Sequence, residues 1–175
     1  QPITSLLALE NSVVREAGAF YTMAQMAEVT AAARSKGLRT HLDGARLFNA
    51  FAETGENPAE TGKHFDSVSI CLSKGLGAPV GSLVLCSAEN AFMARRRRKS
   101  LGGGMRQAGF LAAAGIYALQ NNIARLKEDH GRARIIGDLI KTQPWVVDLM
   151  PVDTNIIIFR LVPSVTPAHF LHAIA

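Results

Sequence analysis

The stretch SKGLGAPVG (residues 73–81) places one lysine between an apolar run and a glycine-rich loop. The run before it, residues 68–72, has the pattern of a short buried strand because turn-forming residues follow it. A lysine at the end of a buried strand is costly to desolvate, and a neutral amine can attack a carbonyl group and form a Schiff base. The alternative is a lysine whose stem lies along the strand end while its ammonium group reaches water. The stretch alone leaves both interpretations open.

An aspartate at the end of an earlier apolar segment favours the Schiff-base interpretation. The segment THLDGAR (residues 40–46) contains Asp43. An acid at the carboxyl end of a parallel strand faces the crevice in which open α/β sheets bind ligands. Pyridoxal phosphate needs both groups, a lysine for the Schiff base and an acid that keeps the pyridine nitrogen protonated. The alternative for Asp43 is an N-cap of a helix over residues 44–52. Considered with Lys74, the aspartate predicts a pyridoxal phosphate site.

Strand and helix patterns alternate along the chain, which predicts an α/β fold. We expect strands at residues 6–9, 38–43, 66–73, 82–87 and 152–161, and helices at residues 23–36, 45–54, 88–100, 105–120, 123–142 and 167–175. The helix over residues 105–120 has small and apolar residues on all sides, which predicts burial. Cys71 and Cys86 both fall in expected strands, so we expect small buried thiols in a reducing compartment.

Composition and charge exclude several classes of protein. The chain has 175 residues, 48% of them hydrophobic, as expected for a globular domain and not for a disordered chain. It shows no apolar run long enough to span a membrane and no secretory signal, so we expect a cytoplasmic protein without a membrane partner.

The net charge of +5 comes largely from the run RRRRK at residues 95–99. Successive helical residues advance by roughly 100° each, so these five side chains surround the helix axis and cannot form one basic face. No aromatic residues are interleaved with them for base stacking. We therefore expect a solvated helix turn or a subunit contact here, and no nucleic-acid partner.

The chain resembles the low-specificity L-threonine aldolases, a pyridoxal-phosphate family. The matching stretches are HLDGARLFNA (residues 41–50), FDSVSICLSKGLGAPVGS (residues 65–82) and RKSLGGGMRQAGFLAAAGIYAL (residues 98–119). The resemblance implies an α/β fold, namely the three-layer α/β/α large domain of the PLP-dependent transferase-like class (fold type I). Residues 1–145 would be the C-terminal part of this domain, and residues 146–175 the start of a small C-terminal α+β domain. It also implies a homotetramer with active sites between subunits.

The resemblance implies roles for three residues around the cofactor. Lys74 would hold pyridoxal 5'-phosphate as a Schiff base, and Asp43 would face its pyridine nitrogen. Arg46 would bind the substrate carboxylate, for which the planar guanidinium fork is suited. Because Arg46 follows Asp43 by three residues, we expect both on one side of a helical turn. The alternative for Arg46 is a surface arginine of a helix.

Three further residues are expected near the cofactor phosphate. Ser73 would hydrogen-bond the phosphate, although a hydroxyl that merely satisfies the strand end is equally compatible. Arg106 follows three glycines at an expected helix start, which suits an anion. In the resembling family, the matches to Lys99 and Arg106 come near the phosphate of a neighbouring subunit, but Lys99 is also simply the end of the basic run. No metal site is expected, because the cysteines and histidines lack metal-ligand spacing.

Two features leave the chemistry incomplete. His41 either supports Asp43 by a hydrogen bond or is a histidine with its hydrogen bonds satisfied in the core. The family commonly has Thr-His-Asn where this chain has Ser12-Val13-Val14, and we find no base for a substrate hydroxyl. Both ends of the chain are abrupt, so we expect an internal fragment that is inactive by itself.

The implied function is a lyase of threonine catabolism and glycine formation. It would cleave L-threonine, L-allo-threonine and related β-hydroxy-α-amino acids to glycine and an aldehyde. The alternatives are another fold-type-I enzyme (a β-lyase or an aminotransferase), an inactive structural fragment, and a basic nucleic-acid-binding module.

Overall fold

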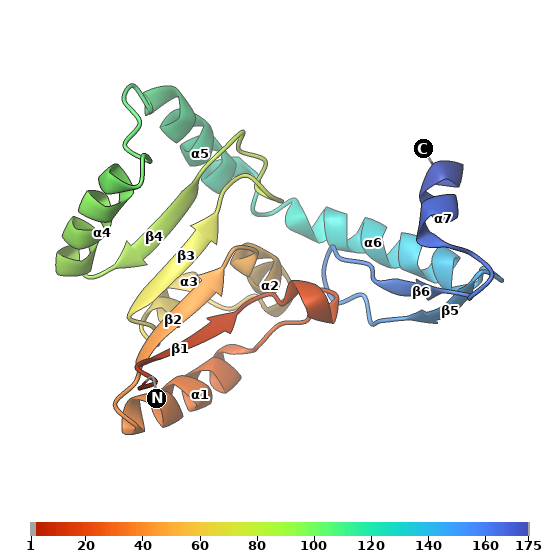
Figure 1. The fold of residues 1–175 in the computed structure, drawn as a ribbon, viewed down its shortest axis with the longest axis horizontal. Helices are drawn as coiled ribbons and strands as arrows, with labels where there is room; N and C mark the ends of the chain where they lie inside the picture. Colours follow the sequence, from red (N-terminus) through yellow and green to blue (C-terminus); the bar gives the residue numbers. More distant parts are fainter. Residues whose placement is uncertain (1–2, 175) are drawn as a thin grey trace. The chain divides into compact units, whose positions relative to one another are not determined.

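A computed structural model describes residues 3–174, which form two compact units (Figure 1). The first unit comprises the chain up to Ser12 and the segment from Phe20 to Leu126, and the second comprises Val13–Ala19 and the chain from Lys127 onward. The predicted boundary between residues 145 and 146 stays a prediction. No helix within residues 3–174 has the length and apolar character needed to cross a membrane.

The first unit contains a four-stranded sheet in the order β1-β2-β3-β4. The first three strands are parallel and the last is antiparallel to its neighbour; they are β1 (Leu6–Glu10), β2 (Arg39–Gly44), β3 (Ser67–Cys71) and β4 (Ser82–Cys86). Parallel neighbours need helical crossovers. These are α1 (Met23–Ser35) between β1 and β2, and α2 (Leu47–Thr54) with α3 (Pro58–Gly62) between β2 and β3. Each predicted strand of this sheet is confirmed to within a few residues.

Local sequence signals set the ends of these helices. α1 begins at a capping box in which the Thr22 and Gln25 side chains each bond the other's main chain, and Gly37 beyond its end has φ +74°. Gly55, with φ +69°, ends α2 in the left-handed conformation that glycine adopts readily. The short helix α3 was not predicted, although Asn57 caps it and Pro58 begins it.

One face of the sheet packs against helices and the other is open. Met26 of α1 and Leu47 and Phe51 of α2 form a core with Leu42 and Val68 of the sheet. Side chains alternate between the two faces of a strand. The opposite face therefore carries residues that are all exposed or half-buried, namely His41, Asp43, Ser67, Ser69, Cys71, Ser82, Val84 and Cys86. The predicted site residue Asp43 lies on this open, mainly polar face.

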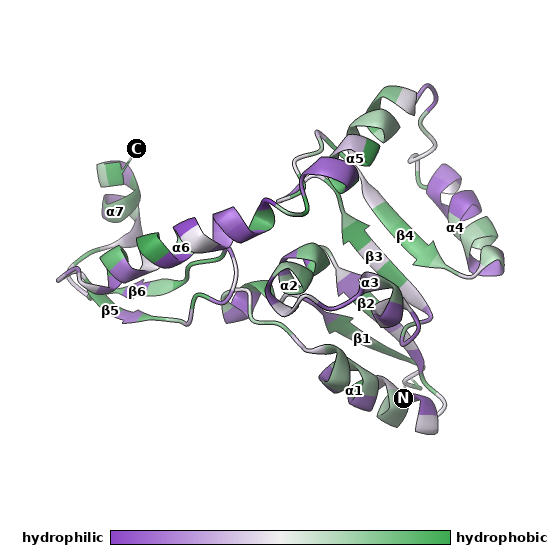
Figure 2. Cartoon of the chain, turned by 180° about the vertical axis from the view of Figure 1, so that it is seen from behind, coloured by the Kyte–Doolittle hydropathy of each residue, from purple (hydrophilic) through white to green (hydrophobic). Residues whose placement is uncertain are grey.

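Two burial predictions for the first unit are wrong. The helices α4 (Ala88–Ser100) and α5 (Gly109–Asn121) follow β4, and the structure leaves most of α5 exposed, including Phe110 and Tyr117. Only its stripe around Gly115 and Ala118 is buried, because this stripe alone packs against the loop after β3. Figure 2 shows that the C-terminal half of α4 is hydrophilic. Cys71 and Cys86 are half-buried free thiols because they lie on the open face of the sheet.

The second unit is built from α6 (Leu126–Lys141), β5 (Val146–Leu149), β6 (Phe159–Leu161) and α7 (Pro167–Ile174), with a short 3-10 helix at Val14–Glu16. The strand predicted over residues 152–161 is limited to β6. Its antiparallel partner β5 was missed because it is only four residues long. Trp145, Phe159 and Phe170 pack with ring centroids 5.2–5.9 Å apart. The helix predicted over residues 167–175 is confirmed, and Ala175 lies outside the described residues.

Candidate active site

Asp43 lies near the carboxyl end of β2, between two parallel strands. The register places it opposite Glu10 of β1 and Ser69 of β3. Its Oδ1 accepts hydrogen bonds from the Ala45 amide at 3.1 Å and, more weakly, from Ser69 Oγ at 3.5 Å. The carboxylate is exposed on the open face of the sheet. Asp43 is not the N-cap of α2, because Arg46 occupies that position.

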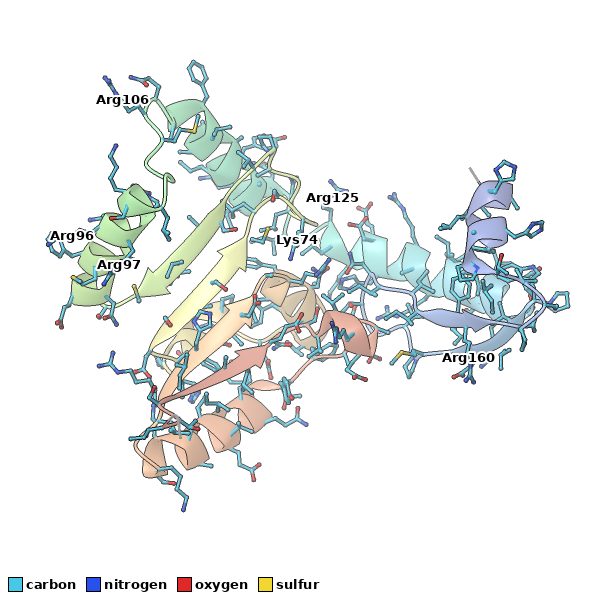
Figure 3. The ribbon with its side chains drawn as sticks, in the orientation of Figure 1. Lys74, Arg96, Arg97, Arg106, Arg125 and Arg160 are labelled. Carbon is cyan, nitrogen blue, oxygen red and sulfur yellow. The ribbon has the colours of Figure 1, made fainter. Side chains whose placement is uncertain are left out.

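Lys74 lies in a turn after β3, and its side chain is exposed. The prediction of a desolvated lysine at the end of a buried strand is therefore wrong in this respect, because β3 ends at Cys71. The Gly77 amide donates to the Lys74 carbonyl at 2.9 Å and closes the turn. Gly77 has φ +76°, which glycine adopts without strain. In Figure 3 the Lys74 label lies beside this turn, next to the end of α5.

The loop that carries Lys74, residues 72–81, is held to its surroundings by several contacts. The Ala78 amide donates to the Leu72 carbonyl at 3.0 Å, and the Leu72 amide donates to the Gly81 carbonyl at 2.9 Å. The Asn122 side chain, at the end of α5, donates to the Leu76 carbonyl at 2.7 Å. These contacts hold the main chain on both sides of an exposed amine.

Cys71 and Ser73 place two polar groups next to Lys74. The Cys71 Sγ and Ser73 Oγ atoms are 3.4 Å apart. Burial raises the pKa of the Cys71 thiol, but hydrogen bonds from Ser73 and Ser82 and the positive charge of Lys74 outweigh burial, so the pKa is lowered overall. Cys71 and Ser73 thus place a thiol and a hydroxyl beside the turn that carries Lys74.

Arg46 precedes α2 and is half-buried. It does not share a helical turn with Asp43, because Asp43 belongs to β2 and the helix begins only at Leu47. Arg46 and Gly75, the residue after Lys74, nevertheless line the same small cavity. The structure therefore brings Arg46 to the loop that carries the lysine.

Lys99 and Arg106 are not brought to this site within the chain. Both are exposed, and Lys99 lies at the end of α4 with its stem against Gly104. Figure 3 shows Arg106 near the start of α5, whereas Lys74 lies near the end of that helix. The basic run over residues 95–99 is exposed at every position, as expected for either a solvated helix turn or a subunit contact.

His41 shares the open face with Asp43 but pairs with a different residue. Its Nδ1 atom lies 2.8 Å from Ser67 Oγ, and the ring is half-buried. The hydrogen bond of His41 is therefore satisfied by Ser67, as in the second interpretation, but on the open face and not in the core. Within residues 3–174 no three histidine, cysteine or acidic side chains gather closely enough to bind a metal ion.

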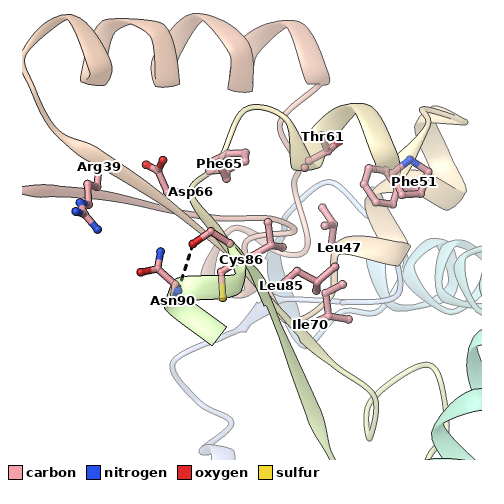
Figure 4. Close-up of a pocket in the computed structure, with 14 residues that line it drawn as sticks. Arg39, Leu47, Phe51, Thr61, Phe65, Asp66, Ile70, Leu85, Cys86 and Asn90 are labelled. Atoms are coloured by element: carbon pink, nitrogen blue, oxygen red, sulfur yellow. Dashed lines mark hydrogen bonds between the residues drawn. The ribbon is translucent and has the colours of Figure 1, made fainter. Parts of the chain in front are cut away.

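One hollow of the first unit lies away from these residues (Figure 4). It has a volume of about 500 Å³ and is lined by apolar side chains, among them Phe51, Phe65, Ile70 and Leu85. Polar residues also line it, among them Ser87, whose Oγ accepts a hydrogen bond from the Asn90 main-chain amide at 3.2 Å. The hollow belongs to the apolar face of the sheet, so it contains neither Asp43 nor Lys74.

Solved structures with a similar fold identify the fold class. A threonine aldolase from Leishmania major superposes with a TM-score of 0.70 at 21% identity, covering 89% of this chain and 46% of that one. A cystathionine gamma-lyase from Lactobacillus plantarum superposes with a TM-score of 0.63 at 16% identity, covering 97% of this chain and 47% of that one. At such identities the likeness shows the fold alone. The predicted fold class is thereby confirmed.

The chain belongs to the beta-eliminating lyase family, because the sequence profile of this family matches residues 1–162. It is 44% identical over 158 residues to the low specificity L-threonine aldolase of Escherichia coli K12, covering 90% of this chain and 46% of that protein. It is 41% identical over 157 residues to low-specificity L-threonine aldolase 1 of Arabidopsis thaliana, covering 89% and 44%. The resemblance inferred from the sequence motifs is confirmed. The chain spans less than half the length of these relatives.

Two residues of the site region were missed by reasoning from the sequence. Ser69 shares the face of Asp43, and the alternation within residues 67–71 would have identified it once the strand register was known. Asn122 gives no local signal, because its partner Leu76 is 46 residues away along the chain.

Proposed function

We propose that the chain is part of a PLP-dependent aldolase. The enzyme would cleave L-threonine, L-allo-threonine and related β-hydroxy-α-amino acids to glycine and an aldehyde. The supporting observation is that Asp43, on the open face near the carboxyl end of β2, and Lys74, exposed in the turn after β3, come from neighbouring parallel strands. The identity of 44% to the E. coli low specificity L-threonine aldolase supports this substrate class.

The residues present fit pyridoxal phosphate. An exposed carboxylate near the carboxyl end of β2 and an exposed amine in the turn after β3 lie at the edge where ligands of open α/β sheets bind. When bound, this cofactor supplies an electron sink for the bond that breaks at the substrate Cα. Lys74 Nζ is the group that would hold it covalently, and Asp43 is the group that would face its ring nitrogen.

The hydrogen bonds of Asp43 indicate which oxygen would serve the ring. Ala45 and Ser69 both donate to Oδ1. These bonds fix the rotation of the carboxylate and leave Oδ2 to accept the proton of a pyridinium nitrogen. A charge-assisted hydrogen bond of this kind is stronger than a neutral one. Asp43 would thereby keep the proton on the ring nitrogen.

Arg46 would orient the substrate. Its guanidinium group can bind both oxygens of an α-carboxylate, and the cavity that it shares with Gly75 places it beside the Lys74 loop. Fixing the carboxylate limits the orientations of the Cα–Cβ bond relative to the lysine. The base that takes the proton of the substrate hydroxyl is not assigned to any residue of this chain.

Three further assignments complete the proposal. Ser73, exposed beside Lys74, would donate to the cofactor phosphate. Lys99 and Arg106 would serve the phosphate of a neighbouring subunit in a homotetramer; Figure 3 shows Arg106 near the start of α5 and Lys74 near its end. Mixing inactive Lys74→Ala and Arg106→Ala subunits should restore part of the activity, whereas sites built within one subunit would restore none.

Both cysteines are free, which supports a reducing compartment such as the cytoplasm.

Substrate profiling of the full-length protein tests the proposed reaction. We expect glycine and acetaldehyde from both L-threonine and L-allo-threonine in the presence of pyridoxal phosphate. Amino transfer to a keto acid, or release of pyruvate and ammonia from L-serine with no glycine from threonine, would instead establish one of the alternative lyase or aminotransferase activities. The 175-residue chain alone should not turn over, because it spans less than half of its relatives.

A further inference from the structure

We propose that Asn122 is a positioning residue that holds the Lys74 loop in the conformation from which the amine reaches the cofactor. This inference rests on the proposed function of Lys74. Asn122 itself would touch neither cofactor nor substrate, and it would act only through the main chain of the loop.

The hydrogen bond between Asn122 and the loop is short and partly buried. Asn122 Nδ2 donates to the Leu76 carbonyl at 2.7 Å. Leu76 is only 4% exposed, so its carbonyl has little access to water. Leaving a buried main-chain carbonyl without a donor costs free energy, so the loop strongly prefers the conformation in which Asn122 binds the Leu76 carbonyl.

The turn transmits this constraint to Lys74. Leu76 lies two residues after the lysine, and the Gly77 amide donates to the Lys74 carbonyl at 2.9 Å. A Cβ atom at Gly77 would lie 3.4 Å from Asn122 Nδ2, so the side-chain amide of Asn122 packs directly against the turn. A shift of the Leu76 carbonyl would therefore move the main chain of Lys74.

The other end of the contact is rigid. The main-chain amide of Asn122 donates to the Ala118 carbonyl at 2.9 Å, and the Ala118 side chain is almost fully buried. A Cβ atom at Gly115 would lie 3.0 Å from Leu72 Cδ1, so α5 packs closely against the start of the loop. Asn122 thus extends from a helix that is already packed against the loop it holds.

The distinguishing variant is Asn122→Asp, which keeps the size of the side chain. It replaces the donating amide with an acceptor and brings two oxygens together at the Leu76 carbonyl. The matched control is Asn121→Asp. Asn121 is exposed, and its Nδ2 donates to the Tyr117 carbonyl of its own helix at 2.9 Å. Both variants add a carboxylate at the C-terminus of α5, so both carry the same unfavourable interaction with the helix dipole.

Two measurements on the full-length protein read the position of Lys74. Misplacement of a reacting group by about 1 Å costs on the order of 100-fold in rate, so Asn122→Asp should lower kcat by this order with a far smaller change in KM. Borohydride reduction in the presence of pyridoxal phosphate, followed by peptide mass analysis, should show slower labelling of Lys74. Asn121→Asp should match the wild type in both measurements.

A third measurement needs no cofactor. Loss of one hydrogen bond changes a local opening equilibrium by roughly 10-fold. Hydrogen–deuterium exchange of the Gly77 and Ala78 amides should therefore be faster by about this factor in Asn122→Asp and in the milder variant Asn122→Ala. The exchange of β1 and β2 amides should stay unchanged if the variants are folded.

The outcomes separate this inference from the proposed function. Absence of Lys74 labelling in the wild type would overturn the proposed function, while the exchange measurement would still decide whether Asn122 orders the loop. Labelling in the wild type with equal kcat, labelling and exchange in the Asn121 and Asn122 variants would overturn the inference. If Asn122→Asp does not fold, Asn122→Ala decides in the same way.

Discussion

Ser69 and Asp43 face each other across neighbouring parallel strands, with Ser69 Oγ 3.5 Å from Asp43 Oδ1. The register that pairs them also places Cys71 on the same face, next to the turn that carries Lys74. A slip of one residue would turn Asp43 towards the apolar core. The register of β2 and β3 therefore makes the Asp43 carboxylate accessible from the face that ends beside the Lys74 turn.

Replacing Asp43 with asparagine should abolish most activity while leaving the fold intact. The amide cannot supply the negative charge that holds a proton on the ring nitrogen, so we expect kcat/KM to fall by at least about 100-fold, as for other preorganised electrostatic groups. Steady-state cleavage of L-threonine by the full-length protein measures this. The control is Ser69→Ala, which removes a weak contact and should cost far less. Equal losses in the two variants would contradict the role given to Asp43.

Replacing Arg46 with lysine should weaken substrate binding. A lysine keeps the charge but cannot bind both oxygens of a carboxylate, so we expect KM to rise by roughly 10-fold or more. Arg95→Lys, on the exposed run of α4, should leave KM unchanged. A KM equal to that of the wild type in Arg46→Lys would remove Arg46 from the substrate site.

The Cys71 thiol should react with alkylating reagents at a lower pH than an ordinary cysteine. Hydrogen bonds from Ser73 and Ser82 and the Lys74 charge outweigh the effect of burial and lower its pKa from the ordinary value of 9.0. A larger fraction is therefore thiolate at neutral pH, and the thiolate is the nucleophile. The rate of iodoacetamide labelling against pH, in a Cys86→Ser background, measures this pKa. Ser73→Ala should raise the pKa and slow labelling; an unchanged profile would contradict the assignment.

Asp66 should stabilise the first unit at neutral pH and lose this effect in acid. The Thr40 amide donates to Asp66 Oδ2 at 2.7 Å and is the main cause of its lowered pKa. Burial raises this pKa, while the Thr40 hydroxyl, Arg34 and Arg39 lower it further. Because the pKa is lower in the folded state, the stabilisation is complete above the ordinary value of 3.8 and disappears as the pH falls through the folded-state pKa.

Urea unfolding measures the contribution of Asp66. Asp66→Asn should lower the free energy of unfolding at pH 7 by about 1 kcal/mol, a value reduced for the solvent exposure of the carboxylate. The difference from the wild type should shrink in strong acid. Glu28→Gln, at an exposed position of α1, should change the stability little at either pH. A destabilisation that is independent of pH would indicate that the charge of Asp66 has no part in it.

The sequence allowed prediction of the sheet, and it singled out Asp43 and Lys74 as site candidates, because both inferences depend on local patterns. Short apolar runs followed by turn residues identified β2 and β3, and the acid and amine lie just where these runs end. The exposure of Lys74 was not predicted, because the run of apolar residues before it does not show that the strand ends at Cys71 and leaves the lysine in a turn. The burial of α5 was also not predictable, because small residues surround the helix and only packing selects the stripe at Gly115 and Ala118.

Contacts between distant segments account for the remaining differences. Asn122 looks like an ordinary residue after a helix, and only the folded chain brings it to Leu76. The placement of Arg46 beside Gly75 likewise depends on how α2 packs next to the loop, whereas the sequence predicted a shared helical turn with Asp43.

The absorbance spectrum of the full-length protein with pyridoxal phosphate tests the central claim most directly. A lysine Schiff base of this cofactor absorbs in the visible range, so the wild type should show a band that is lost in Lys74→Ala. Lys63→Ala, which removes an exposed lysine paired with Glu60, is the matched control and should keep the band. A visible band that persists in Lys74→Ala, or no band in the wild type, would contradict the assignment of Lys74 and with it the roles proposed for Asp43 and Arg46.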